Sequence, residues 1–304
     1  MPKTDFEWGA RSAVQKAIRR GDREMARMAA EVLWDEDPHW LQWRLPAIVP
    51  EEVWQLTPAN HAVLKEVESL MRRKQKASAR EKIIDWTVEL SSYEKNRDPN
   101  GLVLLVLDDW AQKWINDLCL DEFRTNQLSM CREFIARKKA GGDASLFTRL
   151  ERESANLGEW QSKIVDAAKG RYFAGGMDGD RCMLLCLCVM ALTEKELPEA
   201  KKTDVQGDWE YYNGNGQWPW YVYDMHNARG KRAMNKLLGR DASEETKFFF
   251  TRIWFALESG RVNKLDDLSF WWRAYLRCFL KQFGMNRAKW NAPNGFRDRL
   301  RSLV

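Results

Sequence analysis

The sequence has few of the residues, and none of the short motifs, that most often carry catalysis. Only 3 histidines occur among 304 residues, so a metal site built on imidazole is not expected. No GxxxxGK[ST] phosphate loop is present, which excludes that class of ATPase, and no GxGxxG, HExxH or GxSxG pattern occurs. We therefore expect no metal and no cofactor.

Long apolar runs are also missing. The longest, "CMLLCLCVMAL" from Cys182 to Leu192, is shorter than the roughly 18 residues of a membrane span and predicts a buried helix. The first residues contain no apolar segment of the kind that a secretory signal needs. These absences predict a cytoplasmic protein without a membrane partner, whose 6 cysteines are reduced core residues rather than disulfides.

Helical periodicity is the dominant positive signal. "DREMARMAAEVLW", for example, places apolar residues three and four apart on one face. We predict an all-α multi-helix bundle in one or two lobes, residues 1–140 and 141–304, with one long aromatic loop at 197–223. A lobe boundary near residue 200 is the alternative. Pro46, Pro50 and Pro58 are expected to break the chain into short pieces, and residues 96–101, "NRDPNG", to form a turn.

Aromatic and basic residues are the unusual part of the composition. The chain has 16 tryptophans, which are either large anchors between helices or flat surfaces for stacking bases. Its 49 basic and 44 acidic residues give only a mild positive charge, so local clusters matter more. One cluster is the stretch "RRKQKASAREK" at 72–82, which is either a solvated helix junction or a DNA contact.

A second basic cluster follows the aromatic loop, in a helix expected at 224–240. Free amides at the start of that helix and its basic first turns favour a phosphate. The loop is too long and too aromatic for a simple connection, which favours contact with unstacked nucleotides. The predicted DNA-binding residues are Trp218, Trp220, Tyr223, Arg229, Lys231, Arg232 and Lys236.

Asp224 and His226 are the candidate catalytic pair. They lie two apart where the extended segment that ends in Asp224 meets the expected helix, which Asp224 or Asn227 can cap. If the extended geometry continues to His226, both side chains project to one side. A carboxylate beside an imidazole raises its pKa and orients it, as a general base requires. The alternative is an N-cap aspartate next to a packing histidine.

Residues 12–53 resemble the opening of the C-terminal helical collar domain of RarA/MgsA proteins, which are clamp-loader-like AAA+ ATPases. The matching positions are Ser12, Ala13, Lys16, Arg19, Gly21, Ala26, Glu36, Asp37, Pro38, Arg44, Ile48, Glu52 and Val53. A second, weaker resemblance to the same family lies at His226, Asn227, Ala228, Lys231, Met234 and Gly239. The resemblance implies a helical collar, self-association and work on DNA in replication or repair, without the ATPase module.

Three functions are consistent with these patterns. The first is a DNA-binding assembly module that forms homo-oligomers. The second is a DNA base-modifying enzyme, a transferase or glycosylase-like protein acting on a flipped base, because the chain also resembles the helical, tryptophan-rich proteins with which bacteriophages hypermodify thymine. The third is a protein-interaction adaptor whose tryptophans are all core.

Overall fold

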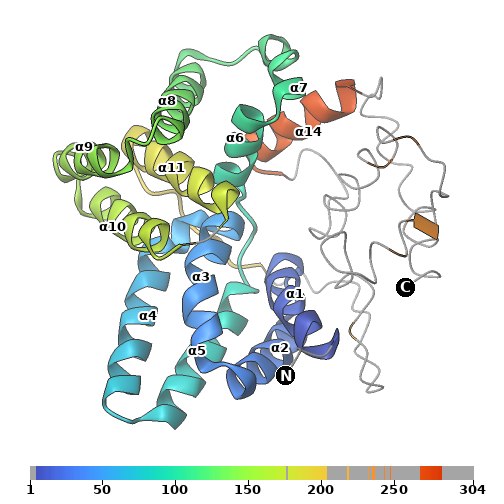
Figure 1. Cartoon of the computed structure of the whole chain (residues 1–304), viewed down its shortest axis with the longest axis vertical. Coiled ribbons are helices and arrows are strands. Elements are labelled where there is room, and N and C mark those ends of the chain that lie inside the picture. Colours follow the sequence, from blue (N-terminus) through green and yellow to red (C-terminus); the bar gives the residue numbers. More distant parts are fainter. Residues whose placement is uncertain are drawn as a thin grey trace.

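The computed structural model describes residues 5–175, 177–203 and 268–282, together with six single positions between 218 and 247. Within these residues the chain forms twelve α-helices and two short 3-10 helices, and no strand (Figure 1). The prediction of an all-α multi-helix bundle is confirmed.

The first six elements surround one core. They are α1 (Asp5–Arg20), α2 (Arg23–Glu36), α3 (Pro38–Glu52), η1 (Trp54–Leu56), α4 (Thr57–Arg72) and α5 (Lys76–Leu90). Local sequence explains the boundaries: Gly21 takes a left-handed φ of 78° after α1, and the Asp22 side chain caps α2 by accepting from the Met25 amide at 2.9 Å. Asp37 caps α3 in the same way, with Pro38 in its first turn.

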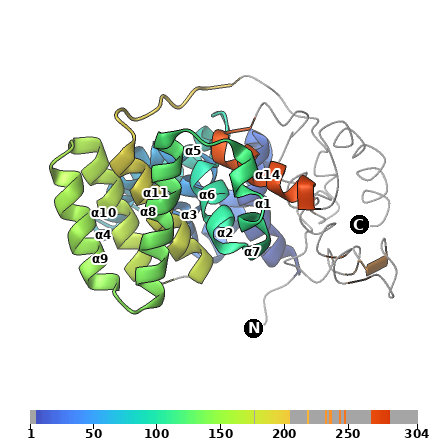
Figure 2. The same cartoon turned by 90° about the horizontal axis from the view of Figure 1, so that it is seen from above.

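The remaining elements surround a second core. They are α6 (Asp98–Leu107), α7 (Asp109–Gln112), η2 (Ile115–Leu118), α8 (Glu122–Lys139), α9 (Asp143–Ala155), α10 (Glu159–Phe173), α11 (Asp178–Thr193) and α14 (Phe270–Gln282). The cysteine-rich α11 lies at the centre, with ten consecutive residues buried, as its uniform apolar sequence predicts. Figure 2 shows α4, α9 and α10 together at one end of the molecule, with α11 and α8 between them and α14.

The two clusters of buried side chains divide between Leu90 and Leu102, except that Trp54 packs in the second cluster and Trp218 in the first. The predicted lobe boundary at residue 140 falls between α8 and α9, which both contribute to the second cluster. Helix α3 joins the clusters, since it contacts α2 and α5 on one side and α6, α10 and α11 on the other.

Two local expectations are wrong. Pro46 and Pro50 do not interrupt the chain, because α3 runs through both. Residues 96–101 do not form a free turn, because α6 already begins at Asp98 with Pro99 in its first turn. Tertiary packing holds α3 intact through its two internal prolines, whereas Pro99 lies in the first turn of α6, where proline is favoured.

Helices α6 and α14 cross very closely at Gly101. A Cβ there would lie 2.3 Å from the Trp272 amide nitrogen and 2.4 Å from the Trp271 carbonyl carbon. The Asp98 carboxylate also accepts a hydrogen bond from the Trp271 amide in the first turn of α14. Only a glycine permits this approach. The crossing therefore fixes α14 against α6, although the two helices are far apart in the sequence.

Most described tryptophans and cysteines belong to the cores. The fully or almost fully buried tryptophans are Trp34, Trp54, Trp86, Trp218, Trp271 and Trp272. All six cysteines are free and five are buried, as expected for reduced core residues. Within the helices that the structure describes, none combines the length and the apolar character that a membrane crossing needs.

Candidate functional site

The segment predicted to carry the site is only partly described. Asp224, His226, Trp220, Tyr223, Arg229 and Lys231 lie outside the described residues, so their proposed roles stay predictions. Arg232 and Lys236 are described and exposed, as a phosphate contact requires. Trp218 is 3% exposed and belongs to the first core.

The burial of Trp218 changes its interpretation. A Cβ on Gly9 of α1 would lie 2.0 Å from the Trp218 indole, so the ring occupies the space that this glycine leaves open. A ring packed in this way offers no face to a nucleotide. In this structure Trp218 therefore serves as a core anchor, which was the alternative interpretation of the tryptophan content.

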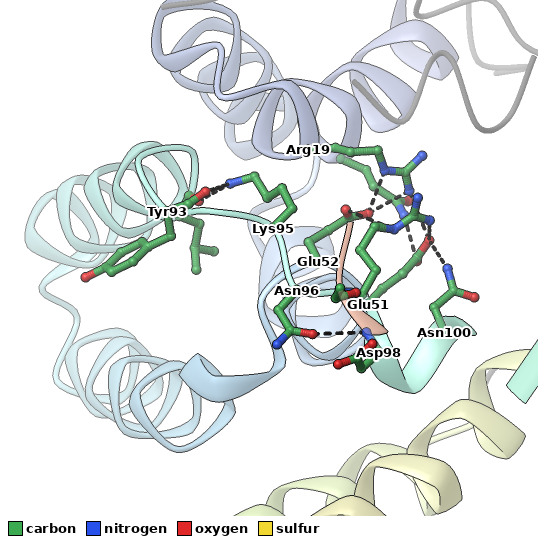
Figure 3. Close-up of polar contacts among 12 residues, drawn as sticks. Arg19, Glu51, Glu52, Tyr93, Lys95, Asn96, Asp98 and Asn100 are labelled. Atoms are coloured by element: carbon green, nitrogen blue, oxygen red, sulfur yellow. Dashed lines mark hydrogen bonds and ion pairs between the residues drawn. The ribbon is translucent and has the colours of Figure 1, made fainter. Parts of the chain in front are cut away.

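A buried ionic network lies where α1, α3 and the segment before α6 meet (Figure 3). Arg19 donates from Nε and Nη2 to Glu52 Oε1 at 2.8 and 2.6 Å, and from Nη2 to Glu51 Oε1 at 2.9 Å. Arg97 Nη2 lies 3.5 Å from Glu51 Oε1, and Arg97 Nε lies 3.6 Å from Glu52 Oε2. Asn100 also donates to Glu51.

The network is structural. Glu52 is completely buried. Burial raises its pKa, but the positive charges of Arg19 and Arg97 together lower it by more, so the net shift is downward and the carboxylate stays ionised. The Arg97 guanidinium lies 4.1 Å from the Trp272 ring of α14, which joins the network to the second core. Arg19 and Glu52 also carry part of the collar resemblance, so that resemblance falls on residues with a folding role.

Lys95 lies beside this network. Its Nζ donates to the Leu90 carbonyl at 2.9 Å and to the Tyr93 carbonyl at 2.6 Å (Figure 3). Burial lowers the pKa of Lys95 to about 7, and the nearby Glu52 carboxylate opposes this shift. Both hydrogen bonds go to backbone near the end of α5, so Lys95 caps that helix rather than facing a ligand.

The turn between α4 and α5 carries the most concentrated exposed positive charge of the described residues. It lies at the lower end of the molecule in Figure 1, away from α6, α7 and α14. Arg72, Arg73, Lys74 and Lys76 are all exposed there. Arg72 pairs with Glu68 at 3.6 Å, whereas in the described part of the chain no acidic group pairs with the other three. This is the exposed half of the basic stretch that the sequence singled out.

The rest of that stretch is neutralised. Arg80 lies 3.7 Å from Asp35, and Lys82 lies 2.8 Å from Glu66. The sequence predicted one continuous basic segment. In the structure Arg80 and Lys82 form ion pairs, whereas at the turn Arg72 pairs with Glu68 and the other three cations pair with no described acidic group.

A pocket of about 440 Å³ lies between α3, α4 and α10, with one residue of α11 at its base. Its α3 wall comes from residues spaced three and four apart, His39, Trp43, Pro46 and Pro50. The pocket exists because α10 presents glycine and alanine here; a Cβ on Gly170 would meet no atom within 4 Å. Its volume lies within the range of small-molecule sites.

The α4 wall supplies polar groups. His61 is half-buried; burial lowers its pKa, Lys65 lowers it further, and Asp166 opposes them. The imidazole is therefore neutral at pH 7, with one donor and one acceptor. Asn60 is buried, and its Oδ1 accepts a hydrogen bond from Trp86 at 2.8 Å. Lys65 and Glu68 lie exposed at the rim.

Trp43 and Arg171 form the most unusual pair in the pocket. Arg171 is 4% exposed, and its guanidinium lies 4.2 Å from the centre of the Trp43 ring. Its Nη1 donates to the Gly175 carbonyl at 2.6 Å, and its Nη2 lies 3.7 Å from Asp180. Trp43 itself is 45% exposed. A large aromatic ring is thus held at the pocket by a buried cation.

Sequence reasoning did not find this pocket. His39 and His61 belong to no recognisable motif, and Trp43 and Arg171 lie 128 positions apart with no shared motif. Two weak signals were present: the two prolines inside α3, and the small residues of α10. In the described part of the chain no group of three or more histidine, cysteine or acidic side chains is arranged to hold a metal.

Comparison with known proteins adds no family. No protein-family model, curated protein or solved structure matches this chain.

Proposed function

We propose that the protein binds DNA, with the α4–α5 turn as one contact and the basic segment around Arg232 and Lys236 as another. The observation that carries the proposal is the group of unpaired cations Arg73, Lys74 and Lys76 at an exposed helical turn. Such cations gain most from phosphates, because no protein carboxylate has to be displaced and each contact releases counterions.

The position of the turn supports the same proposal. A hairpin end that projects from the body can approach a backbone without steric conflict, and its charges can move to follow the phosphates. The exposed positions of Arg232 and Lys236 are consistent with a second phosphate contact. Phosphate contacts of this kind give affinity and position but carry little sequence preference.

The test is a charge-removal experiment at the turn. In Arg73→Ala/Lys74→Ala/Lys76→Ala, the slope of log K against log[salt] should fall by about two to three for DNA, with weaker binding to every sequence alike. The matched control removes three exposed cations from α9, α10 and the segment after α11, in Arg152→Ala/Lys163→Ala/Lys195→Ala. Fluorescence anisotropy of labelled single- and double-stranded oligonucleotides over a salt series measures both.

The two triple variants lose the same charge, so the comparison separates position from net charge. An unchanged slope in the turn variant, or equal losses in the two variants, would refute the turn as a DNA contact.

A further inference from the structure

The pocket between α3, α4 and α10 offers a flat surface, a polar edge and a nearby cation. We infer that it binds the base of a nucleotide, as a free nucleotide or as an unstacked unit of a bound strand. The strand form rests on the DNA-binding function proposed above, whereas the free form does not. This location differs from the aromatic segment that the sequence suggested.

Trp43 supplies the flat surface. The buried Arg171 guanidinium lies against its ring and holds it in place, while nearly half of Trp43 remains exposed at the pocket. Stacking on a ring that is already fixed costs little ordering entropy. Any base can stack on such a surface, because every base has a π face.

The α3 wall supplies hydrogen-bond acceptors. Pro46 and Pro50 have no N–H, so the carbonyls of Gln42 and Pro46 receive no amide hydrogen bond from four residues ahead. Gln42, Pro46 and Pro50 all line the pocket. These carbonyls suit the amino or imino donors on the edge of a base.

The α4 wall complements them. The neutral imidazole of His61 has both a donor and an acceptor, and base edges carry the same mixture. An entirely apolar ligand would leave the imidazole and the two carbonyls without partners, which is costly in a partly buried site.

The charge distribution argues against a simple inorganic anion. The Arg171 Nε and Nη2 atoms are buried and have no hydrogen-bond partner, so a small anion in the pocket cannot reach them directly. The accessible cation is Lys65 at the rim, where Glu68 partly offsets it. A ligand with its ring inside and its phosphate at the rim fits both facts.

The rim also leads to the proposed DNA contact. Lys65 and Arg72 lie seven residues apart on α4, which is about 10 Å along the helix axis. A strand whose phosphates lie on the α4–α5 turn and continue along α4 therefore passes near the pocket mouth.

The experiment has a free-nucleotide arm and a strand arm. Isothermal titration with each of the four deoxynucleoside monophosphates, and anisotropy with a short single-stranded oligonucleotide, are measured on wild type, Trp43→Ala and Gly170→Leu. Loss of stacking should weaken binding about ten-fold in Trp43→Ala. Gly170→Leu should weaken it to a similar extent, because the new side chain extends from a position that lines the pocket and is otherwise open.

The control is Ala62→Leu, an exposed position of α4 that does not line the pocket, and it should bind as wild type does. Circular dichroism of all variants checks that they fold, and Gly170→Leu gives a test that does not depend on removing Trp43. If wild type binds no mononucleotide at millimolar concentration and strand binding is unchanged in both pocket variants, the inference is wrong.

The turn variant distinguishes this inference from the proposed function. Mononucleotide binding that survives in Arg73→Ala/Lys74→Ala/Lys76→Ala, together with lost strand binding, supports both. Mononucleotide binding that depends on Trp43, in a protein that binds no DNA at all, supports the pocket with a free nucleotide and refutes the DNA contact. Strand binding that depends on the turn but not on Trp43 or Gly170, without mononucleotide binding, leaves the proposed function standing and refutes the pocket.

Discussion

Individual side chains in this protein combine opposing effects of burial and charge. Glu52 stays ionised although it is fully buried, because two arginines surround it. Removing one partner of such a buried pair typically costs about 3–5 kcal/mol, since the other charge is then left uncompensated. Lys95 shows the reverse balance, because the effect of burial on its pKa exceeds the attraction of Glu52.

The lowered pKa of Lys95 predicts a specific pH dependence of stability. The pKa is about 7 in the folded protein, against an ordinary value of 10.5. Between these values the unfolded chain binds more protons at this position, so the contribution of Lys95 to the free energy of unfolding rises with pH. Urea unfolding of wild type and Lys95→Met at pH 7 and pH 9 should show wild type gaining relative to the variant at pH 9. An equal difference at both pH values would contradict the lowered pKa.

At the scale of elements, glycine and proline decide how closely helices approach and where a space remains. Gly101 lets α14 cross against α6, and Gly170 leaves the pocket open beside α10. The prolines of α3 keep the helix intact but leave carbonyls without their usual donors. Judged from local sequence, glycine and proline end helices. Inside these helices they instead set how closely neighbouring helices pack and which carbonyls lack a donor.

The two glycines therefore predict opposite effects of one substitution. Gly101→Ala should destabilise the protein by about 1–3 kcal/mol or more, because the added Cβ overlaps the α14 backbone. Gly170→Ala should be neutral or stabilising by about 0.5–1 kcal/mol, because alanine favours the helix and meets nothing. Urea denaturation midpoints of both variants measure the difference. Similar midpoints for the two variants would show that α6 and α14 do not pack as described.

At the scale of the whole molecule, two cores are joined through α3 and the buried ionic network. The α4–α5 turn, which we propose contacts DNA, lies on the α3–α4–α5 side, and the pocket lies on the boundary of that side with α10. Both proposed contacts thus share α4, which runs from the pocket wall to the turn. A single helix can in this way couple a phosphate contact to a base contact.

The absence of a phosphate loop predicts that the whole molecule does not hydrolyse ATP. The resemblance to collar domains implies DNA work without the motor that would use ATP. Phosphate release by the purified protein, with and without DNA, should not exceed that of buffer. Clear DNA-stimulated turnover would show that the motif argument fails for this chain.

Several features follow from the sequence alone. The apolar spacing and the Asp22, Asp37 and Gly21 signals determine helices, because capping and periodicity act within a few residues. The buried, reduced character of the Cys182–Leu192 run follows from its uniform apolarity. The concentration of charge at 72–82 is also visible in the sequence, but not which of its cations find partners.

Only the tertiary structure decided the rest. Trp218 belongs to the core because Gly9, 209 positions earlier, leaves room for its ring. Lys82 is neutralised because the hairpin places Glu66 beside it, whereas among the residues that the structure describes no acidic group pairs with Arg73 or Lys74. The pocket depends on α10 presenting glycine and alanine toward α3 and α4. Contacts of this kind join positions that are far apart in the sequence, so the sites they form exist only once the helices have packed. Each helix, by contrast, is already specified by its own short stretch of chain.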